Sequence, residues 1–454
     1  MKRGRYLTLV ALACAMEAGF IALALLGDLS QNVAEFTGVF LGTSLFYLLS
    51  CFAITRWEVT EGARSRLMVL IWVCGLVFRL SVLPLSPELS EDLNRYRWHG
   101  MIQAAGENPY TAIPEDPRFE HLRDATWPHI GRKDLPSVYG PVVEWVFAGW
   151  YPVAAWVEPD ALRQVWWFKL PFALLEIGIV LAVSWLLAAT GKPRTWLLIY
   201  LWSPLTVVEF WAQGHNDTFA VLFVVVAVAA AISDRWTLAF GSLTLAVLSK
   251  FWPVILFPFL LLRREEGCWV FRWKQALVAV PILVVVAGPY WGSLGSVQEL
   301  LEGFLGGWRN NDSLYGIIYE RANEDPDLGT ERVTYYLGAA LTGLWFLGRP
   351  LLESVKWAIV VLLFFSANCF PWYLSWFLPF LAVSPNAALL LWTALVGLAY
   401  HVLINYEVLG VWEYSDAFRG LEYLPVYGLL LVSGAIGLAL QWRASRRKAS
   451  MDPS

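Results

Sequence analysis

Apolar runs about as long as a lipid bilayer is thick recur along the whole chain of 454 residues. An α-helix needs roughly 20 mostly apolar residues to cross the hydrocarbon core. Hydrophobic residues make up 58% of the chain and charged residues only 15%, whereas about 25% charged residues is usual in soluble domains. The clearest candidate spans cover residues 7–26, 33–54, 67–85, 165–189, 276–291, 387–404 and 421–440. With the shorter runs between them, they predict an all-α, polytopic transmembrane bundle of about 11–14 spans.

Basic residues orient this bundle, because short cytoplasmic loops collect Lys and Arg. Lys2, Arg3 and Arg5 precede a first transmembrane helix, since many further spans follow and a cleaved signal would stand alone. The other basic clusters lie near residues 56–66, 192–194, 235, 263–274 and 349–356, and in the tail, 443–454. We therefore expect both termini in the cytoplasm.

The long hydrophilic loops then share the opposite, external face of a single membrane domain formed by residues 1–454. They are a first external loop, residues 86–140, and a second, residues 293–332, with a shorter loop at 407–419. The run 142–157 would reverse this arrangement if it crossed the bilayer. We interpret it as a re-entrant or surface-lying helix.

The first external loop is charged and aromatic, unlike the rest of the chain. It contains Glu91-Asp92-Leu93-Asn94-Arg95-Tyr96-Arg97-Trp98-His99-Gly100 and then Gly106-Glu107-Asn108-Pro109-Tyr110. Such a loop at the end of an apolar helix is typical of a catalytic or ligand-binding loop at a membrane surface. Pro109 disfavours helix at the preceding residue, so a surface helix starting near Leu93 should end at Asn108. Its exposed face would touch lipid through Tyr96, Trp98 and Met101.

Several common kinds of site have no support in the sequence. The five cysteines suggest no disulfide framework, and Cys and His show no metal-ligand spacing. There is no phosphate-binding loop, dinucleotide fingerprint or nucleophile elbow. We expect no cofactor and no nucleic-acid partner. The sequence gives no support for a divalent metal.

The order of motifs resembles the glycosyltransferase-C superfamily. It is most similar to family 87 and to related bacterial mannosyltransferases that use polyprenyl-phosphate sugars. The motifs span about two thirds of the chain: the acidic pair with Arg95-Tyr96-Arg97-Trp98, Gly106 to Tyr110, Tyr139-Gly140-Pro141, Trp202-Ser203-Pro204-Leu205 through Glu209 to Gly214-His215-Asn216-Asp217, Leu248 to Pro253, and Pro371-Trp372-Tyr373.

The resemblance implies transfer of a hexose, with mannose as the closest match, and inversion at the sugar carbon. The donor would be a polyprenyl-phosphate sugar and the acceptor a glycolipid or glycan hydroxyl on the non-cytoplasmic face. It also implies location in a bacterial inner membrane.

Two positions depart from the family pattern. His99 stands where the family commonly has Asp, so a second carboxylate is missing and a metal held between two acids is less expected. Gly140 stands where the family commonly has Pro. We expect it to leave the start of the following helix less rigid.

The expected chemistry needs a base for the incoming hydroxyl and cations for the leaving phosphate. Asp92 is the candidate general base, with Glu91 as the second choice; the alternative is that one of the two caps the following helix. Lys250 interrupts an apolar stretch and is the candidate phosphate ligand, although it could instead snorkel or pair with Glu209 or Asp217. Arg95 and Arg97 are further candidates for phosphate binding. A position on a surface that faces water or lipid headgroups would explain these two cations equally well.

Other candidates would bind the sugar or the phosphate. His215, Asn216 and Asp217 supply donors and acceptors, although Asn216 or Asp217 could simply cap the next helix. Trp372 and Tyr373 could stack on sugar, but an interfacial aromatic belt explains them better. The remaining candidates for substrate binding are Tyr96, His99, Asn108, Tyr110, Tyr139 and Gln213. A polar loop at residues 306–327, including Trp308 and Asn323, would face the first loop as an acceptor site, although a disordered connector fits its composition equally well.

Two other classes of protein stay open. A transporter or lipid flippase would also place intramembrane charges such as Glu144, Lys169, Glu176 and Lys250 along a pathway. The concentration of charge in one external loop and the lack of a visible inverted repeat favour the glycosyltransferase. A non-catalytic scaffold is the third class, and the His99 departure is its best support.

Overall fold

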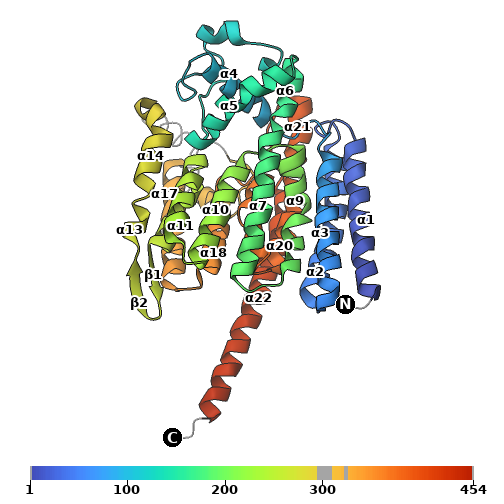
Figure 1. Cartoon of the computed structure of the whole chain (residues 1–454), viewed down its shortest axis with the longest axis vertical. Helices are drawn as coiled ribbons and strands as arrows, with labels where there is room; N and C mark the ends of the chain where they lie inside the picture. Colours follow the sequence, from blue (N-terminus) through green and yellow to red (C-terminus); the bar gives the residue numbers. More distant parts are fainter. Residues whose placement is uncertain (1–2, 294–308, 322–325, 452–454) are drawn as a thin grey trace.

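The computed structural model describes residues 3–293, 309–321 and 326–451, and its helices form an upright bundle with a smaller layer at one end (Figure 1). Seven helical stretches in this part of the chain are long and apolar enough to cross a membrane. They are Arg3–Leu25, Val33–Arg56, Glu61–Val82, Ala161–Ala189, Trp273–Ser293, Ala387–Tyr406 and Asp416–Gly437. They match the seven runs predicted from hydropathy, which confirms an all-α polytopic bundle.

The first half of the bundle has long helices followed by short, broken ones. The long ones are α1 (Arg3–Leu25), α2 (Val33–Arg56), α3 (Glu61–Val82), α7 (Lys169–Ala189), α10 (Asp217–Ile232) and α11 (Trp236–Ser249). Between α7 and α10 the chain forms η3 (Arg194–Leu197), α8 (Leu198–Leu201), α9 (Pro204–Thr206) and the π-helical η4 (Val207–Ala212); after α11 come η5 (Trp252–Leu256) and α12 (Phe257–Leu261).

A β-hairpin interrupts the helices after α12, which hydropathy did not predict. Strands β1 (Leu262–Glu265) and β2 (Cys268–Phe271) pair antiparallel, with Leu262 opposite Phe271. Glu266 and Gly267 form the two-residue turn with φ values of 48° and 88°, as a hairpin turn of the primed type requires. The hairpin lies at the end of the bundle opposite the α4 layer (Figure 1).

The second half completes the bundle. Its elements are α13 (Trp273–Ala276), α14 (Ala279–Ala287), η6 (Gly288–Ser293), α16 (Leu314–Glu320), α17 (Pro326–Phe346), α18 (Leu351–Phe364), η7 (Pro371–Trp376), α19 (Leu378–Leu381), α20 (Ala387–Leu395), η8 (Val396–His401), α21 (Val402–Leu409) and α22 (Asp416–Met451). Helix α22 runs beyond the bundle, and both ends of the chain lie away from the α4 layer (Figure 1).

The layer at one end of the bundle, here called the cap, is built from the first long hydrophilic loop and the helices after it. It comprises α4 (Asp92–Ala104), η1 (Pro117–Leu122), η2 (Trp127–His129), α5 (Pro141–Val157) and α6 (Ala161–Trp167) (Figure 1). Helix α5 covers the run that the sequence suggested as surface-lying, and it packs against α4. Gly100 allows a close approach, since a Cβ there would lie 2.5 Å from the carbonyl oxygen of Phe147.

Helix α4 does not expose an aromatic face to lipid, and that expectation was wrong. Tyr96 is fully buried with Phe147 and Phe172. Trp98 and Met101 are buried in a second apolar cluster formed with the η1–η2 segment. The segment from residue 105 to residue 140 folds back over α4 and covers the side that the sequence alone leaves open.

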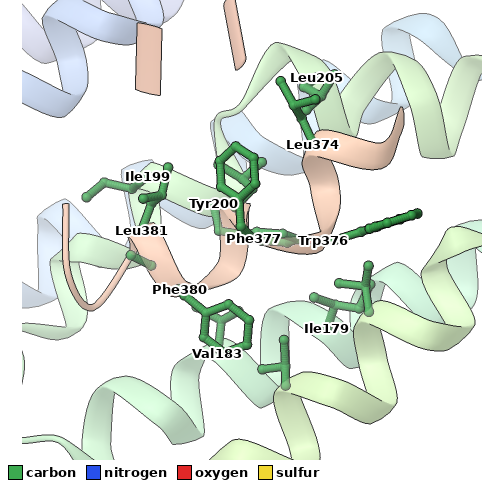
Figure 2. Close-up of a cluster of buried hydrophobic side chains, with 14 of the residues drawn as sticks. Ile179, Val183, Ile199, Tyr200, Leu205, Leu374, Trp376, Phe377, Phe380 and Leu381 are labelled. Carbon is green, nitrogen blue, oxygen red and sulfur yellow. The ribbon is translucent and has the colours of Figure 1, made fainter. Parts of the chain in front are cut away.

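Proline residues break the helices at the centre of the bundle into short turns, because proline removes a helical N–H donor and clashes with the preceding turn. Figure 2 shows the result: Ile199, Tyr200 and Leu205 lie in one apolar cluster with Leu374, Trp376, Phe377, Phe380 and Leu381, and with Ile179 and Val183 of α7.

A buried ion pair ties α3 to α7. Arg79 donates two hydrogen bonds to the carboxylate of Glu176, at 2.6 and 2.9 Å, and two more to the carbonyl oxygens of Gly75 and Leu201. Both side chains are almost fully buried. Closed hydrogen bonding of this kind is what makes a charge tolerable within a membrane.

Candidate active site

Asp92 opens α4 and points to the junction between the cap and the bundle. Glu91 occupies the N-cap position and forms no side-chain cap hydrogen bond. The Asp92 carboxylate accepts hydrogen bonds from the hydroxyls of Tyr96 at 3.1 Å and Tyr139 at 3.3 Å. Two phenols from different parts of the cap therefore orient this carboxylate.

His215 reaches the same carboxylate from the bundle. It follows Gly214, whose φ of +71° is a left-handed conformation that glycine adopts readily. Its Nδ1 lies 3.4 Å from Oδ2 of Asp92, and its Nε2 lies 3.3 Å from Oε2 of Glu209. The ring also stacks on Trp372 with centroids 3.8 Å apart. Neither nitrogen makes a well-aligned hydrogen bond to the described residues, so we treat both contacts as ion pairs.

Glu209 forms the inner end of this row of ionisable groups. It lies in the π-helical segment η4, fully buried, and accepts hydrogen bonds from the Tyr400 hydroxyl at 2.9 and 3.0 Å. A π-turn within a helix often marks a functional site. Here it places Glu209 beneath His215, so that the row runs from Tyr400 through Glu209 and His215 to Asp92.

The charges in this row support one another. Burial lowers the pKa of His215, but the contacts with Asp92 and Glu209 outweigh it and raise that pKa to about 9. Burial raises the pKa of Asp92, but His215 and the nearby Lys250 outweigh it and hold that pKa below its ordinary value. Near neutral pH the pair is therefore a carboxylate beside an imidazolium.

Lys250 and Asp217 form a second ion pair at the same junction. The Lys250 ammonium donates to both carboxylate oxygens of Asp217, at 2.7 and 2.8 Å, and lies over the rings of Tyr373 and Trp376. The Trp376 indole also donates to Asp217, at 2.5 Å. The sequence alternative that pairs Lys250 with Asp217 is therefore what the structure shows, and the two aromatic rings hold the ammonium in place.

Exposure separates the groups that a substrate can reach from those that support them. The side chains of Asp92 and Lys250 are 33% and 25% exposed, whereas those of His215, Glu209 and Asp217 are at most 1% exposed. Asp92 can accept a proton and Lys250 can bind an anion. The arrangement thus combines an accessible base with an accessible cation.

Other candidates from the first loop hold the cap together. Arg95 donates to the carbonyl oxygens of Gly131, Arg132, Leu135 and Pro136, and Arg97 bonds to Gln164, Thr126 and Asp124. These contacts favour a structural role over phosphate binding. The carboxylate of Glu91 lies against Gly131, on the loop that Arg95 holds.

His99 does not join the ion-pair row. Its Nδ1 lies 2.7 Å from Oε1 of Glu144, which also accepts a hydrogen bond from Ser137. Burial lowers the pKa of His99 more than Glu144 raises it. His99 is therefore a buried partner of Glu144 in α5.

Asn108 and Tyr110 shape the loop that follows α4. The Asn108 side chain accepts from the backbone N–H of Tyr110 and donates to Ser293, and the Tyr110 hydroxyl donates to the carbonyl oxygen of Tyr139. Gln213 accepts from the backbone N–H of Leu89, and the Asn216 N–H donates to Tyr96. These contacts connect the cap to the bundle directly below Asp92.

Sequence reasoning did not select Tyr400 or Trp376. It named Glu209 within a motif and as a partner for Lys250, but not as a residue of the site. The signal for Glu209 was its place in an apolar run, where an acidic residue needs a partner. Nothing in the local sequence around Tyr400 indicates its contact, which spans 191 positions.

The polar loop at residues 306–327 is only partly described, and residues 306–308 and 322–325, with Trp308 and Asn323, lie outside the described residues. Its described part packs on the bundle: Asn310 pairs with Asn368, and Asn311 donates to Glu422. Among the described residues, no group of three His, Cys, Asp or Glu side chains is arranged to hold a metal ion.

Taken together, the fold and site define a polytopic membrane protein with an acid and a cation at one end of its bundle. Residues 8–264, more than half of the chain, match the family described as Alpha-(1->6)-mannopyranosyltransferase, N-terminal domain. The chain belongs to this family and is a membrane glycosyltransferase. No curated protein and no solved structure matches the chain.

Proposed function

We propose that this protein transfers mannose from a polyprenyl-phosphate donor to a hydroxyl of a glycolipid or glycan. The family description supports mannose as the sugar and an α-(1→6) linkage as the product. The observation that carries the proposal is the pairing of the accessible carboxylate of Asp92 with the accessible ammonium of Lys250 at one junction.

The reaction is a single displacement at the anomeric carbon. The acceptor oxygen attacks this carbon, its proton passes to Asp92, and the bond from the carbon to the phosphate oxygen breaks. Polyprenyl phosphate leaves with the bonding electrons, and Lys250 binds its negative charge. The displacement inverts the anomeric centre. A positioned base contributes about 10²- to 10⁴-fold in rate.

His215 holds Asp92 ionised and oriented in this proposal. A carboxylate with a low pKa is a weak base for a free alcohol. The carboxylate becomes an effective base once the acceptor oxygen has begun to bond to the sugar carbon. The acceptor oxygen then loses electron density, and its proton becomes more acidic. Asp92 is therefore suited to accept the proton late in the displacement.

The proposed setting is a bacterial inner membrane, with the cap on the non-cytoplasmic face and both termini in the cytoplasm. The basic hairpin at the opposite end of the bundle supports this orientation, because cationic loops favour the cytoplasmic side. The donor lipid and a lipid-linked acceptor would both reach the junction from the bilayer.

The transporter alternative has less support. The charges that would line a pathway are held by separate partners: Glu144 by His99, Lys169 by the carbonyl oxygens of Leu83 and Leu85, and Glu176 by Arg79. Closed pairs at separate places favour structural roles for these charges over a continuous route.

The test uses purified protein in bacterial lipid with radiolabelled polyprenyl-phosphate mannose and a membrane lipid extract that contains acceptors. Release of polyprenyl phosphate should fall about 10²- to 10⁴-fold in Asp92→Asn, while donor binding survives. Asp116→Asn is the matched control, because Asp116 is an acid of the same cap that pairs with exposed Arg118. Full activity in Asp92→Asn with loss in Glu91→Gln would move the base to Glu91. No turnover and no donor binding in the unsubstituted protein would contradict the whole proposal.

A further inference from the structure

A pocket of about 530 Å³ opens at the end of the bundle opposite the cap, beside the β-hairpin. It lies between β2, the start of α11 and the start of α13. Its lining includes Asp234, Trp236, Phe271, Arg272, Trp273 and Lys274. The bundle separates this pocket from Asp92, so it plays no part in the proposed transfer of sugar.

Arg272 is the central group of the pocket. Its guanidinium lies over the ring of Trp236, 3.6 Å from the ring centre, and donates to Glu265 at 2.6 Å. Its side chain is 11% exposed, and its Nη1 has no hydrogen-bond acceptor among the described residues. A buried donor without an acceptor is costly, and a phosphate oxygen is a suitable partner for a guanidinium held in place by stacking.

The charges around Arg272 leave the pocket cationic. Glu265 is shared, because it contacts Arg263 at 3.1 Å as well as Arg272. Asp234 also lines the pocket, and its carboxylate accepts a 2.6 Å hydrogen bond from the Trp236 indole. Lys274 lies exposed at the rim, beside the Trp273 ring. Glu265 thus serves two arginines, and the lining itself holds two cations, Arg272 and Lys274, against the carboxylate of Asp234.

Exposed aromatic side chains place the pocket at the level of lipid headgroups. Trp269, Phe271 and Trp273 are 50%, 58% and 48% exposed. Trp273 begins a helical stretch, Trp273–Ser293, that is long and apolar enough to cross a membrane. Aromatic belts and basic residues occur together at this boundary of a bilayer, and basic pockets there bind anionic headgroups.

We propose that this pocket binds the phosphate of an anionic phospholipid headgroup, with Arg272 and Lys274 as its ligands. The aromatic rim favours a lipid over a free phosphate, because Trp269 and Phe271 would contact the acyl chains. The bound lipid would hold the hairpin and the start of the Trp273–Ser293 span against α11.

The test compares the full-length protein in nanodiscs of phosphatidylcholine alone and of phosphatidylcholine with phosphatidylglycerol. Native mass spectrometry of the released protein counts the retained lipids, and a thermal melt in each lipid measures stabilisation. We expect retention of phosphatidylglycerol to fall about fivefold in Lys274→Gln and further in Arg272→Gln, since each interfacial cation contributes about that factor. Arg56→Gln is the matched control, because Arg56, the last residue of α2, also lies over an aromatic ring, that of Phe52.

The two variants keep the test decisive. Arg272→Gln also removes a contact of the hairpin, so if it fails to fold, Lys274→Gln alone decides the result. Equal retention of phosphatidylglycerol in Lys274→Gln, Arg56→Gln and the unsubstituted protein would overturn the proposal. The same would follow if inorganic phosphate in phosphatidylcholine nanodiscs stabilised the protein as much as phosphatidylglycerol does, because the pocket would then take free phosphate. Neither result depends on whether the protein transfers sugar.

Discussion

Asp92 of the cap and His215 of the bundle face each other across the junction of the two layers, with Oδ2 and Nδ1 3.4 Å apart. The two residues lie on elements that no short stretch of chain connects. The ion pair therefore exists only when the cap sits on the bundle, and the candidate base is ionised and oriented only in that arrangement.

The first prediction concerns the pH dependence of stability. The pKa of His215 is raised to about 9 in the folded protein, against about 6.5 when unfolded. Its contribution is complete below pH 6.5 and is lost as pH rises through about 9. We expect the free energy of unfolding to fall by roughly 3 kcal/mol in total as this contribution is lost. Thermal melts between pH 6 and pH 10 measure this loss.

The control for this prediction is His121, a histidine of the cap. His215→Gln should flatten the change between pH 6.5 and pH 9, whereas His121→Gln should keep it, because His121 is exposed on η1. An unchanged profile in His215→Gln would show that the contact with Asp92 does not stabilise the imidazolium.

The second prediction separates the structural and functional roles of Lys250. Lys250→Met leaves the carboxylate of Asp217 buried without its ammonium, and breaking such a pair typically costs about 3–5 kcal/mol, less here because Lys250 is partly exposed. Adding Asp217→Asn should restore much of the thermal stability. Donor binding should stay at least about tenfold weaker in both variants, since one charge-assisted hydrogen bond contributes about 1.5–3 kcal/mol.

Titration with the polyprenyl-phosphate sugar measures this binding, and melts measure stability. A double variant that regains both stability and donor affinity would show that Lys250 is only a structural partner of Asp217.

The third prediction concerns Gly140. Its N–H donates to the carbonyl oxygen of Ser249, and a Cβ at this position would lie 2.1 Å from the carbonyl oxygen of Leu248. The contact holds Gly140 in place, contrary to the expectation of a looser helix start. Gly140→Ala should force apart two segments that carry Tyr139 and Lys250. We expect a loss of about 1–3 kcal/mol in stability and up to about 10²-fold in kcat/KM.

Gly149→Ala is the matched control, because Gly149 lies within α5, the helix that Gly140 precedes, and a Cβ there meets no atom within 4 Å. Kinetics and melts of both variants measure the difference. Equal activity in the two would mean that the close approach at Gly140 has no role in placing the site.

The fourth prediction concerns the buried pair that joins α3 to α7. Arg79→Met removes four hydrogen bonds and leaves Glu176 buried without its cation. The expected loss is about 3–5 kcal/mol, seen as a large fall in the melting temperature in detergent. Arg118→Gln should leave the melting temperature almost unchanged, because its pair with Asp116 is exposed and screened by water. Similar melting temperatures for these two variants would contradict a stabilising role for Arg79.

Much of the fold follows from local sequence. All seven long spans were predicted, because crossing a bilayer is set by the length and apolar character of a continuous segment. The charge pattern singled out the first hydrophilic loop, and the family resemblance of its motif selected Asp92 within that loop. The charge pattern also singled out His215 and Lys250, because a polar or charged group beside apolar helices must find a partner.

Tertiary structure decided which side chains meet. Local sequence predicted that Trp98 and Met101 would face lipid, but the returning segment between residues 105 and 140 buries both. Glu209 and Tyr400 meet across 191 positions, and Gly140 is needed because of a carbonyl oxygen in α11. Hydropathy reports the free energy of moving a segment from water to lipid. This free energy depends only on the residues of that segment. Contacts between distant segments depend on how the helices pack, and only the folded chain brings Asp92, His215 and Glu209 into one row.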